Sequence, residues 1–426
     1  MGMNNLKISN SRDYFLLDGK PFFYLADTCW SAFTNISKEE WEEYLDFRKT
    51  QGFNVLQIAA LPQWDGISDE EFIHPFKVKE DGKYDYFDIN KDYFSHAGAM
   101  LQMAVDKGFI PAIALLWCDF VPETWASNTN PSRIMPLEAV KPYVEYAVNA
   151  FKKYNAIYLI SGDTDLKTDL VKKYYMTVLN TVKEISPEAV TTMHLCGHLS
   201  DIPEEFINSE KLDFYMYQSS HMQEQQQVAY TLAEDFYMKP VKRPVLNGEP
   251  CYEGHGYGGK YGRFDDFDVR KAIWQSLLSG AKAGVTYGAH GIWSWHNKKK
   301  RFNSEGYSSM PFPWREALRF KGAWDAGFSK WIFENYDLYD IEPYKSIINK
   351  TEEIRMSASK DMKKVVIYVP CSTNVGIDKE LKGYKWTMIS LSSNYFLTPE
   401  VAVEGNKTMI RMNNLNSDSL IIGNKL

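Results

Sequence analysis

Two segments of the chain each place a carboxylic acid directly after a short apolar run and a glycine. The first covers 156–163 and reads Ala-Ile-Tyr-Leu-Ile-Ser-Gly-Asp, ending at Asp163. The second covers 243–252, where Pro244 opens an apolar run that leads through Asn-Gly to Glu249. A buried parallel strand reads as a continuous apolar run, and a (β/α)₈ barrel keeps its chemistry at the carboxyl ends of such strands. The two segments therefore predict a pair of catalytic carboxylates.

Glycoside hydrolysis is the reaction that needs such a pair. One carboxyl group protonates the leaving oxygen, and the other attacks the sugar or activates a water molecule. By strand count Asp163 closes the fourth strand and Glu249 the seventh, on opposite sides of a barrel mouth. Two other interpretations stay open: Asp163 or Asp165 as the N-cap of the following helix, and Glu249 as a solvated turn residue.

The other predicted strand ends carry polar and aromatic side chains that can contact a sugar. Flat rings stack on the apolar C–H faces of sugars, and polar groups bind the hydroxyls. Core packing is the alternative for the tryptophans. The candidate substrate-binding residues are Asp27, Trp30, Gln57, Trp117, Asp119, His194, Gln218, Tyr252, His255, His290 and Trp293.

Two further motifs suggest other chemistries. His194-Leu-Cys-Gly-His198 resembles part of a metal site, but zinc needs three or four convergent ligands and the sequence has no HExxH. Residues 254–260 match most of the phosphate-binding loop motif, but Tyr261 stands where that motif requires Ser or Thr. We therefore expect no metal and no cofactor, and we interpret the glycine-rich stretch as an aromatic-bearing loop beside the site.

Strand-like and helical patterns alternate eight times through the first 340 residues, which predicts an α/β protein with a (β/α)₈ TIM barrel. An N-terminal hairpin turns at Asp18-Gly19, and Ser37 has the spacing of a helix capping box. The predicted barrel strands are 22–26, 55–60, 109–116, 156–163, 189–195, 212–218, 243–249 and 284–290.

After Pro343 the pattern changes to short β-type runs separated by Gly, Asn and Asp, at 365–370, 386–390, 400–403 and 409–412. This pattern is typical of a small all-β sandwich. We predict two domains: 1–345, a catalytic barrel with an N-terminal β-hairpin, and 346–426, an all-β accessory domain.

Composition narrows the class of protein. The 426 residues carry a formal charge of −7, which disfavours a nucleic-acid partner, and the one dense basic run, 298–301, is typical of a solvated loop. Five widely spaced cysteines favour a reducing compartment. Because the sequence also shows no leader and no long apolar stretch, we expect a cytoplasmic protein without a membrane partner.

Taken together, these segments resemble the apiosidase-like TIM-barrel glycoside hydrolases. The resemblance rests on residues 17–30, 52–57, 160–163, 244–250 and 287–291, and on a C-terminal β-domain of the collagen-binding-like type. It implies that Asp163 is the acid/base and Glu249 the nucleophile. Asp165-Leu166 follows the strand-four motif where many relatives carry Asn or Arg-Asn.

Our hypothesis is a retaining, exo-acting glycosidase that cleaves apiose, arabinofuranose or a related sugar from imported plant-derived oligosaccharides. Three alternatives stay open: an endoglucanase-like hydrolase of the same barrel clan, a non-catalytic carbohydrate-binding protein on a hydrolase scaffold, and a metal-dependent amidohydrolase. The sugar, the linkage and the oligomeric state are not predicted.

Overall fold

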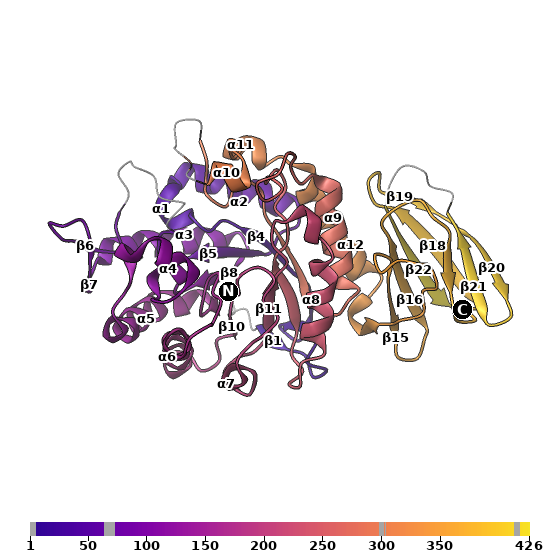
Figure 1. Cartoon of the computed structure of the whole chain (residues 1–426), viewed down its shortest axis with the longest axis horizontal. Coiled ribbons are helices and arrows are strands. Elements are labelled where there is room, and N and C mark those ends of the chain that lie inside the picture. The colour runs from indigo at the N-terminus through magenta and orange to yellow at the C-terminus, as the bar shows by residue number, and fades with distance from the viewer. Residues whose placement is uncertain (1–5, 64–72, 298–301, 303, 413–417) are drawn as a thin grey trace.

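A computed structural model describes residues 6–63, 73–297, 302, 304–412 and 418–426, and shows a parallel barrel beside an antiparallel β-domain (Figure 1). Within these residues, six parallel strands follow the order β10-β9-β8-β5-β4-β13, and β11 pairs with β12. The barrel strands are β4 (Tyr24–Thr28), β5 (Val55–Ala59), β8 (Ile110–Ala114), β9 (Ile157–Leu159), β10 (Thr191–Thr192), β11 (Tyr215–Gln218), β12 (Val245–Glu249) and β13 (Gly284–Tyr287). The eight predicted strands are therefore present in the predicted order.

Backbone hydrogen bonds join the two parallel sheets into one ring. Asp213 N–H donates to Thr191 O at 3.0 Å beside β10, and a parallel bridge links His194 with Met216. On the other side, Ala283 N–H donates to Val245 O at 3.3 Å. The predicted barrel class is confirmed, and β9 and β12 carry the two candidate acids toward the same end of it.

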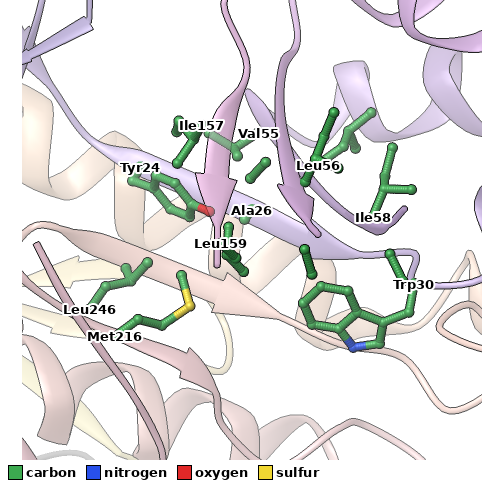
Figure 2. Close-up of a cluster of buried hydrophobic side chains, with 14 of the residues drawn as sticks. Tyr24, Ala26, Trp30, Val55, Leu56, Ile58, Ile157, Leu159, Met216 and Leu246 are labelled. Atoms are coloured by element: carbon green, nitrogen blue, oxygen red, sulfur yellow. The ribbon is translucent and has the colours of Figure 1, made fainter. Parts of the chain in front are cut away.

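Large side chains fill the barrel interior (Figure 2). Tyr24, Leu159, Met216 and Leu246 point inward from four strands and are buried. A Cβ atom on Gly248 would lie 2.2 Å from Met216 Cγ. Gly248 thus lets the Met216 side chain pack directly against β12, one residue before Glu249.

Helices surround the barrel, and their ends follow local capping rules. The Ser37 hydroxyl accepts from the Glu40 amide at 3.2 Å, so the predicted capping box is confirmed. The longer helices are α2 (Lys38–Thr50), α3 (Lys91–Asp106), α5 (Leu137–Phe151), α6 (Asp169–Ile185), α8 (Val228–Tyr237), α9 (Asp266–Leu277) and α12 (Lys321–Asn335). Short helices are α1 (Ala32–Asn35), α4 (Trp125–Thr129), α7 (Glu204–Ile207), α10 (Glu305–Ser308) and α11 (Trp314–Ala317).

The N-terminal segment forms the predicted hairpin, with β1 (Leu6–Ile8), β2 (Phe15–Leu17) and β3 (Lys20–Phe22) in one sheet. Asp18 and Gly19 both have positive φ, which matches the twist of a two-residue hairpin turn. Phe15 is buried against Phe214, with ring centroids 5.1 Å apart. The hairpin therefore packs onto residues at the start of β11, away from the strand ends that carry the acids. A second hairpin, β6 (Phe76–Val78) with β7 (Tyr84–Ile89), lies between β5 and α3.

The C-terminal region contains a six-stranded and a three-stranded antiparallel sheet. The first has the order β14 (Ile341–Pro343), β15 (Arg355–Ser359), β16 (Lys364–Val369), β22 (Ser419–Lys425), β18 (Tyr384–Ser390) and β19 (Tyr395–Leu397). The second has the order β17 (Val375–Ile377), β21 (Lys407–Arg411) and β20 (Glu400–Glu404). This arrangement agrees with the predicted all-β domain.

The central strands of the six-stranded sheet, β16 and β22, are buried on both faces. Along β16, Val365 and Ile367 belong to the core of the β-domain, whereas Val366 and Tyr368 pack with the barrel core. Alternate residues of a strand point to opposite faces, so one strand serves both cores. The β-domain is therefore docked on the barrel by an apolar sheet face.

Buried ion pairs reinforce this contact. Arg270 of α9 lies 3.2 Å from Asp418 of the C-terminal region and 2.8 Å from Asp325 of α12. Arg355 of β15 forms an ion pair with Glu234 of α8. Strand β14 pairs with β15, so the chain enters the second sheet at residue 341, and the division at 345/346 stays a prediction.

Two further expectations from the sequence concern the basic run and membrane-spanning segments. The basic run 298–301 lies outside the described residues. Among the residues that are described, no helix has both the length and the apolar character needed to span a membrane.

Candidate active site

A cavity of about 580 Å³ opens among the loops that follow the barrel strands, and both candidate acids line it. Asp163 follows β9 and Glu249 ends β12. The volume lies within the range of about 300–1,000 Å³ that is usual for small-molecule sites. Eight sequence-predicted residues line this cavity: Trp30, Trp117, Asp163, Gln218, Glu249, Tyr252, His255 and Trp293.

Glu249 is surrounded by side-chain donors. Gln218 Nε2 and His221 Nε2 each lie 3.0 Å from Glu249 Oε1, and His194 Nε2 lies 3.3 Å from Oε2. Burial by itself would raise the pKa of Glu249, but the interactions with His194 and His221 outweigh it and lower the pKa to about 2. The donors around Glu249 thus favour its carboxylate form.

Backbone amides fix the proton of each histidine. Asp163 N–H donates to His194 Nδ1 at 3.2 Å, and Tyr252 N–H donates to His221 Nδ1 at 3.2 Å. A ring nitrogen that accepts a hydrogen bond carries no hydrogen, so the proton of each neutral imidazole sits on Nε2. In both rings Nε2 is the atom that faces Glu249, which makes both histidines donors to the carboxylate.

The backbone at Asp163 is in an unusual conformation. Its φ is +53°, in the left-handed region that non-glycine residues rarely adopt and that is often found at functional sites. Its N–H bonds to His194, and its carbonyl accepts from Trp125 Nε1 at 2.9 Å. The N-cap of α6 is Thr168, whose hydroxyl accepts from the Val171 amide, so the capping interpretation of Asp163 and Asp165 is wrong.

Gly162 lets a tryptophan lie directly beside Asp163. A Cβ atom on Gly162 would lie 2.0 Å from Trp117 Cε3, and a parallel bridge joins the two residues. Trp117 packs edge-on against Trp30 with ring centroids 5.0 Å apart, and Trp30 Nε1 donates to the Tyr252 hydroxyl at 3.1 Å. These contacts form an aromatic wall of the cavity that both acids line.

Beyond His221, two more imidazole rings, those of His255 and His290, pack one against the next. His255 stacks on His221 at 4.2 Å, and His290 lies 4.8 Å from His255. Burial lowers the pKa of His290 to about 3, so this ring is neutral and accepts from Trp293 Nε1 at 3.1 Å through Nδ1. His290 is therefore placed behind the cavity wall, where it orients Trp293.

Besides His194 and His290, which do not line the cavity, three predicted substrate contacts lie outside it. Asp27 is fully buried and forms an ion pair with Arg48 at 2.6 Å. Gln57 Nε2 donates to hydroxyl groups inside the barrel. Asp119 pairs with Arg133 at 2.6 Å, although burial raises the pKa of Asp119 to about 6. All three hold structural positions beneath or beside the site.

Sequence reasoning did not select several residues that line the cavity. The most important is His221, which touches Glu249; its position three residues after β11 is a signal that was available. The others come mostly from loops whose path no local pattern predicts. They are Gln63, Trp125, Cys196, Gly197, His198, Ser220, Met222, Ser304, Tyr307 and Ser308.

The His194–His198 motif and the glycine-rich loop 254–260 were the two segments that suggested other chemistries. Among the described residues, no group of three or more His, Cys, Asp or Glu side chains is arranged to hold a metal ion. In the glycine-rich loop, Gly256 N–H donates to Ser308 O at 2.7 Å and Gly259 N–H to Tyr307 O at 2.8 Å. The loop amides thus fasten α10 over the cavity, so a main-chain segment occupies the donors that a phosphate would need.

Comparison of this sequence with models of known protein families identifies the family of the chain. The family model for the apiosidase-like catalytic domain matches residues 9–340. This chain belongs to the apiosidase-like family. The resemblance that the motifs suggested is therefore confirmed, and the chain is a glycosidase that acts on carbohydrate. No curated protein sequence matches the chain.

Solved structures agree on the fold of this apiosidase-like protein. A glycoside hydrolase matches with a TM-score of 0.82 and 20% identity, over 99% of this chain and 97% of the other. A family 5 glycoside hydrolase from Bacteroides vulgatus gives 0.81 and 19%, over 99% and 93%. A β-L-arabinopyranosidase from Geobacillus stearothermophilus gives 0.55 and 8%, over 95% and 97%. At these identities the likeness concerns the fold alone.

Proposed function

We propose that the protein is a retaining glycosidase in which Glu249 attacks the anomeric carbon and Asp163 acts first as acid and then as base. The observation that carries the proposal is the environment of Glu249. Its carboxylate faces the cavity, is kept ionised by neighbouring donors, and shares the cavity with a second carboxyl group. These are the two groups that the reaction needs.

The two oxygens of Glu249 are not equivalent. Oε1 lies 3.0 Å from both Gln218 Nε2 and His221 Nε2, whereas Oε2 has the longer contact of 3.3 Å to His194. Oε2 therefore keeps more of its lone-pair density, and we assign it the bond to the anomeric carbon. The donors on Oε1 hold the carboxylate in orientation while the glycosyl ester forms and breaks.

Asp163 supplies the proton that the leaving oxygen needs. Its backbone is anchored at the N–H by His194 and at the carbonyl by Trp125, so the side chain starts from a fixed point on the cavity wall. After the leaving group departs, the Asp163 carboxylate takes a proton from water, and the resulting hydroxide equivalent releases the sugar from Glu249.

The substrate we propose is the non-reducing end of a plant-derived oligosaccharide, with apiose, arabinofuranose or a related sugar as the terminal unit. The family description and the limited cavity volume support a chain end over a long polymer. Trp30, Trp117 and Trp293 provide ring surfaces for the apolar face of that sugar. A cytoplasmic site of action on imported oligosaccharides remains part of the same proposal.

The test begins with the anomeric configuration of the first product. Aryl apiosides and arabinofuranosides are the first substrates, and NMR during the first turnovers distinguishes retention from inversion. Glu249→Gln should abolish turnover because no glycosyl ester can form. Asp163→Asn should slow substrates with poor leaving groups most, because an activated aryl group needs little protonation. Asp165→Asn is the matched control, since Asp165 pairs with Lys167 and lies outside the cavity.

Azide assigns the two roles separately. Azide should restore turnover of Asp163→Ala and give a glycosyl azide of retained configuration, because it attacks the glycosyl ester without base help. An inverted azide product from the Asp163 variant would mean that the two roles are exchanged. An inverted product from the unmodified enzyme would rule out the two-step mechanism altogether.

A further inference from the structure

Helix α12 carries aromatic side chains on its outer face. Trp324, Phe328 and Trp331 stand at positions i, i+4 and i+7, the spacing that places residues on one side of a helix. Trp324 is 46% exposed and Trp331 is 45% exposed. The opposite side of α12, with Ala323 and Ile332, is buried against the barrel. The outer tryptophans are thus additional to the residues that dock the helix.

The aromatic surface continues on both sides of the helix. Phe47 of α2 contacts Trp324, with ring centroids 6.3 Å apart. Phe396 of β19 lies 6.1 Å from Trp331 and is 47% exposed, and Phe328 stacks on Trp331 at 5.6 Å. We call these five residues the aromatic platform. It crosses from the barrel to the β-domain.

We propose that the aromatic platform binds an extended carbohydrate chain and holds it outside the active-site cavity. Trp324 and Trp331 are seven residues apart, so they are separated by about 10.5 Å along the helix axis. In an extended glycan, two sugar rings with one further unit between them are separated by a distance of this order. Exposed apolar surface of this kind marks an interaction site, and flat rings match the C–H faces of sugars.

A second copy of the chain is the less suitable occupant. The three half-exposed rings, Trp324, Trp331 and Phe396, offer about 350 Å² at most, since an aromatic side chain has about 150–250 Å² to bury. A stable protein interface needs about 800 Å² from each partner. Strand β19 has an open edge in its sheet but covers three residues, too short for strong edge-to-edge pairing. A sugar chain needs contact with two or three rings.

The platform is separate from catalysis. Its five residues lie outside the cavity that contains Asp163 and Glu249. The inference therefore rests on the glycosidase family and not on the roles proposed for these two acids. Platform binding would raise the local concentration of the glycan whose chain end is cleaved, without changing the chemical step.

Affinity gel electrophoresis of the full-length Glu249→Gln protein tests the proposal. The gels contain soluble arabinan, rhamnogalacturonan, arabinoxylan or galactomannan, so that binding is measured without cleavage. Adding Trp324→Ala and Trp331→Ala should weaken the retarding interaction at least tenfold. Phe87→Ala is the matched control, because Phe87 is 64% exposed and lies outside both the platform and the cavity. A thermal unfolding scan verifies that the exposed substitutions leave the fold intact.

Kinetics separate the platform from the active site. In the otherwise unmodified enzyme, Trp324→Ala with Trp331→Ala should leave kcat/KM on a small aryl glycoside within twofold. The proposal is overturned if none of the four polysaccharides retards the parent protein, or if retardation survives the double substitution. Light scattering that shows a dimer converted to a monomer by the same substitutions would also overturn it, in favour of a self-interface. If Glu249→Gln stays active, the catalytic proposal fails while the retardation result stands.

Discussion

Glu249 depends on its histidine neighbours for its charge. His221 is the nearer of the two rings and is accessible to substitution without changing the strand that carries Glu249. Removing it takes away one hydrogen bond to a charged group, worth about 1.5–3 kcal/mol. The pKa of Glu249, now lowered to about 2, must then rise, because burial is opposed by fewer donors.

We expect His221→Ala to move the acid limb of the pH–kcat/KM profile upward by about 1–2 pH units. The sign follows from the ionised form being the reactive one: a higher pKa means that more of the carboxylate is protonated at low pH. The activity lost should be recovered as pH increases, and a profile from pH 3 to 8 measures it.

His221→Gln is the conservative control, since its side-chain amide can donate to Glu249 Oε1 as the imidazole does. The acid limb of His221→Gln should stay close to that of the unmodified enzyme. Equal profiles for the Ala and Gln variants would show that His221 does not set the charge state of Glu249.

At the residue scale, the sequence was sufficient to predict that Asp163 and Glu249 lie at strand ends that meet, and both line one cavity, but it did not sort the other strand-end residues. Asp27 and Asp119 also follow apolar runs, although without the glycine that precedes Asp163. Their partners, Arg48 and Arg133, are 21 and 14 positions away in the chain. Whether an acid faces the cavity or a buried guanidinium is decided by helix and loop packing, which no strand-end pattern contains.

At the scale of the elements, the residue after β9 that precedes Asp163 has to be a glycine, because a tryptophan ring occupies the space of its side chain. Gly162 is the residue that allows the indole of Trp117 to lie against the strand end just before Asp163. A methyl group there must displace the ring or bend the backbone, and such overpacking costs about 1–3 kcal/mol. Either adjustment disturbs a residue that lines the cavity.

Gly162→Ala should therefore lower the melting temperature and raise KM together. Gly306→Ala is the matched control, because no described atom lies within 4 Å of the position where its Cβ would be. Thermal unfolding gives the melting temperatures of the two variants, and steady-state kinetics on one aryl glycoside give their KM values. A Gly162→Ala enzyme with unchanged KM would mean that Trp117 makes no contribution to binding.

Helices and strands were predicted correctly where the spacing of apolar residues and the capping residues indicate the same element. The barrel strands are continuous apolar runs, and Ser37 opens α2 as expected. Strands β15 and β22 were not predicted. Arg-Met-Ser-Ala-Ser in β15 lacks an apolar run. Strand β22 is buried by the barrel on one face and by the core of the β-domain on the other, which is a tertiary effect.

At the scale of the whole molecule, Arg270 is the main polar connection between the domains. It is almost fully buried between Asp418 and Asp325. Breaking a buried pair by removing one partner leaves uncompensated charge and costs about 3–5 kcal/mol. The β-domain should therefore loosen from the barrel when this guanidinium is lost.

We expect the unmodified chain to resist limited proteolysis near 339–350, and Arg270→Ala to be cut there and to melt at a lower temperature. Arg411→Ala is the matched control, because its pair with Glu400 is exposed and worth about 0–1 kcal/mol. Equal cleavage of both variants would indicate that the apolar sheet face alone holds the domains together. Cleavage sites mapped by mass spectrometry also test the predicted division at 345/346.

The hydrogen bond from the Asp163 amide to His194 has a consequence for how this site can diverge. This link between the two acids passes through the main chain of residue 163. Any replacement that keeps the amide leaves the donor set of Glu249 in place, whereas proline at 163 would remove the amide hydrogen and disfavour the positive φ. We expect Asn at position 163, which tolerates a positive φ, to remove the proton donor and leave the donors around Glu249 in place. New leaving-group preferences are open to selection one substitution at a time.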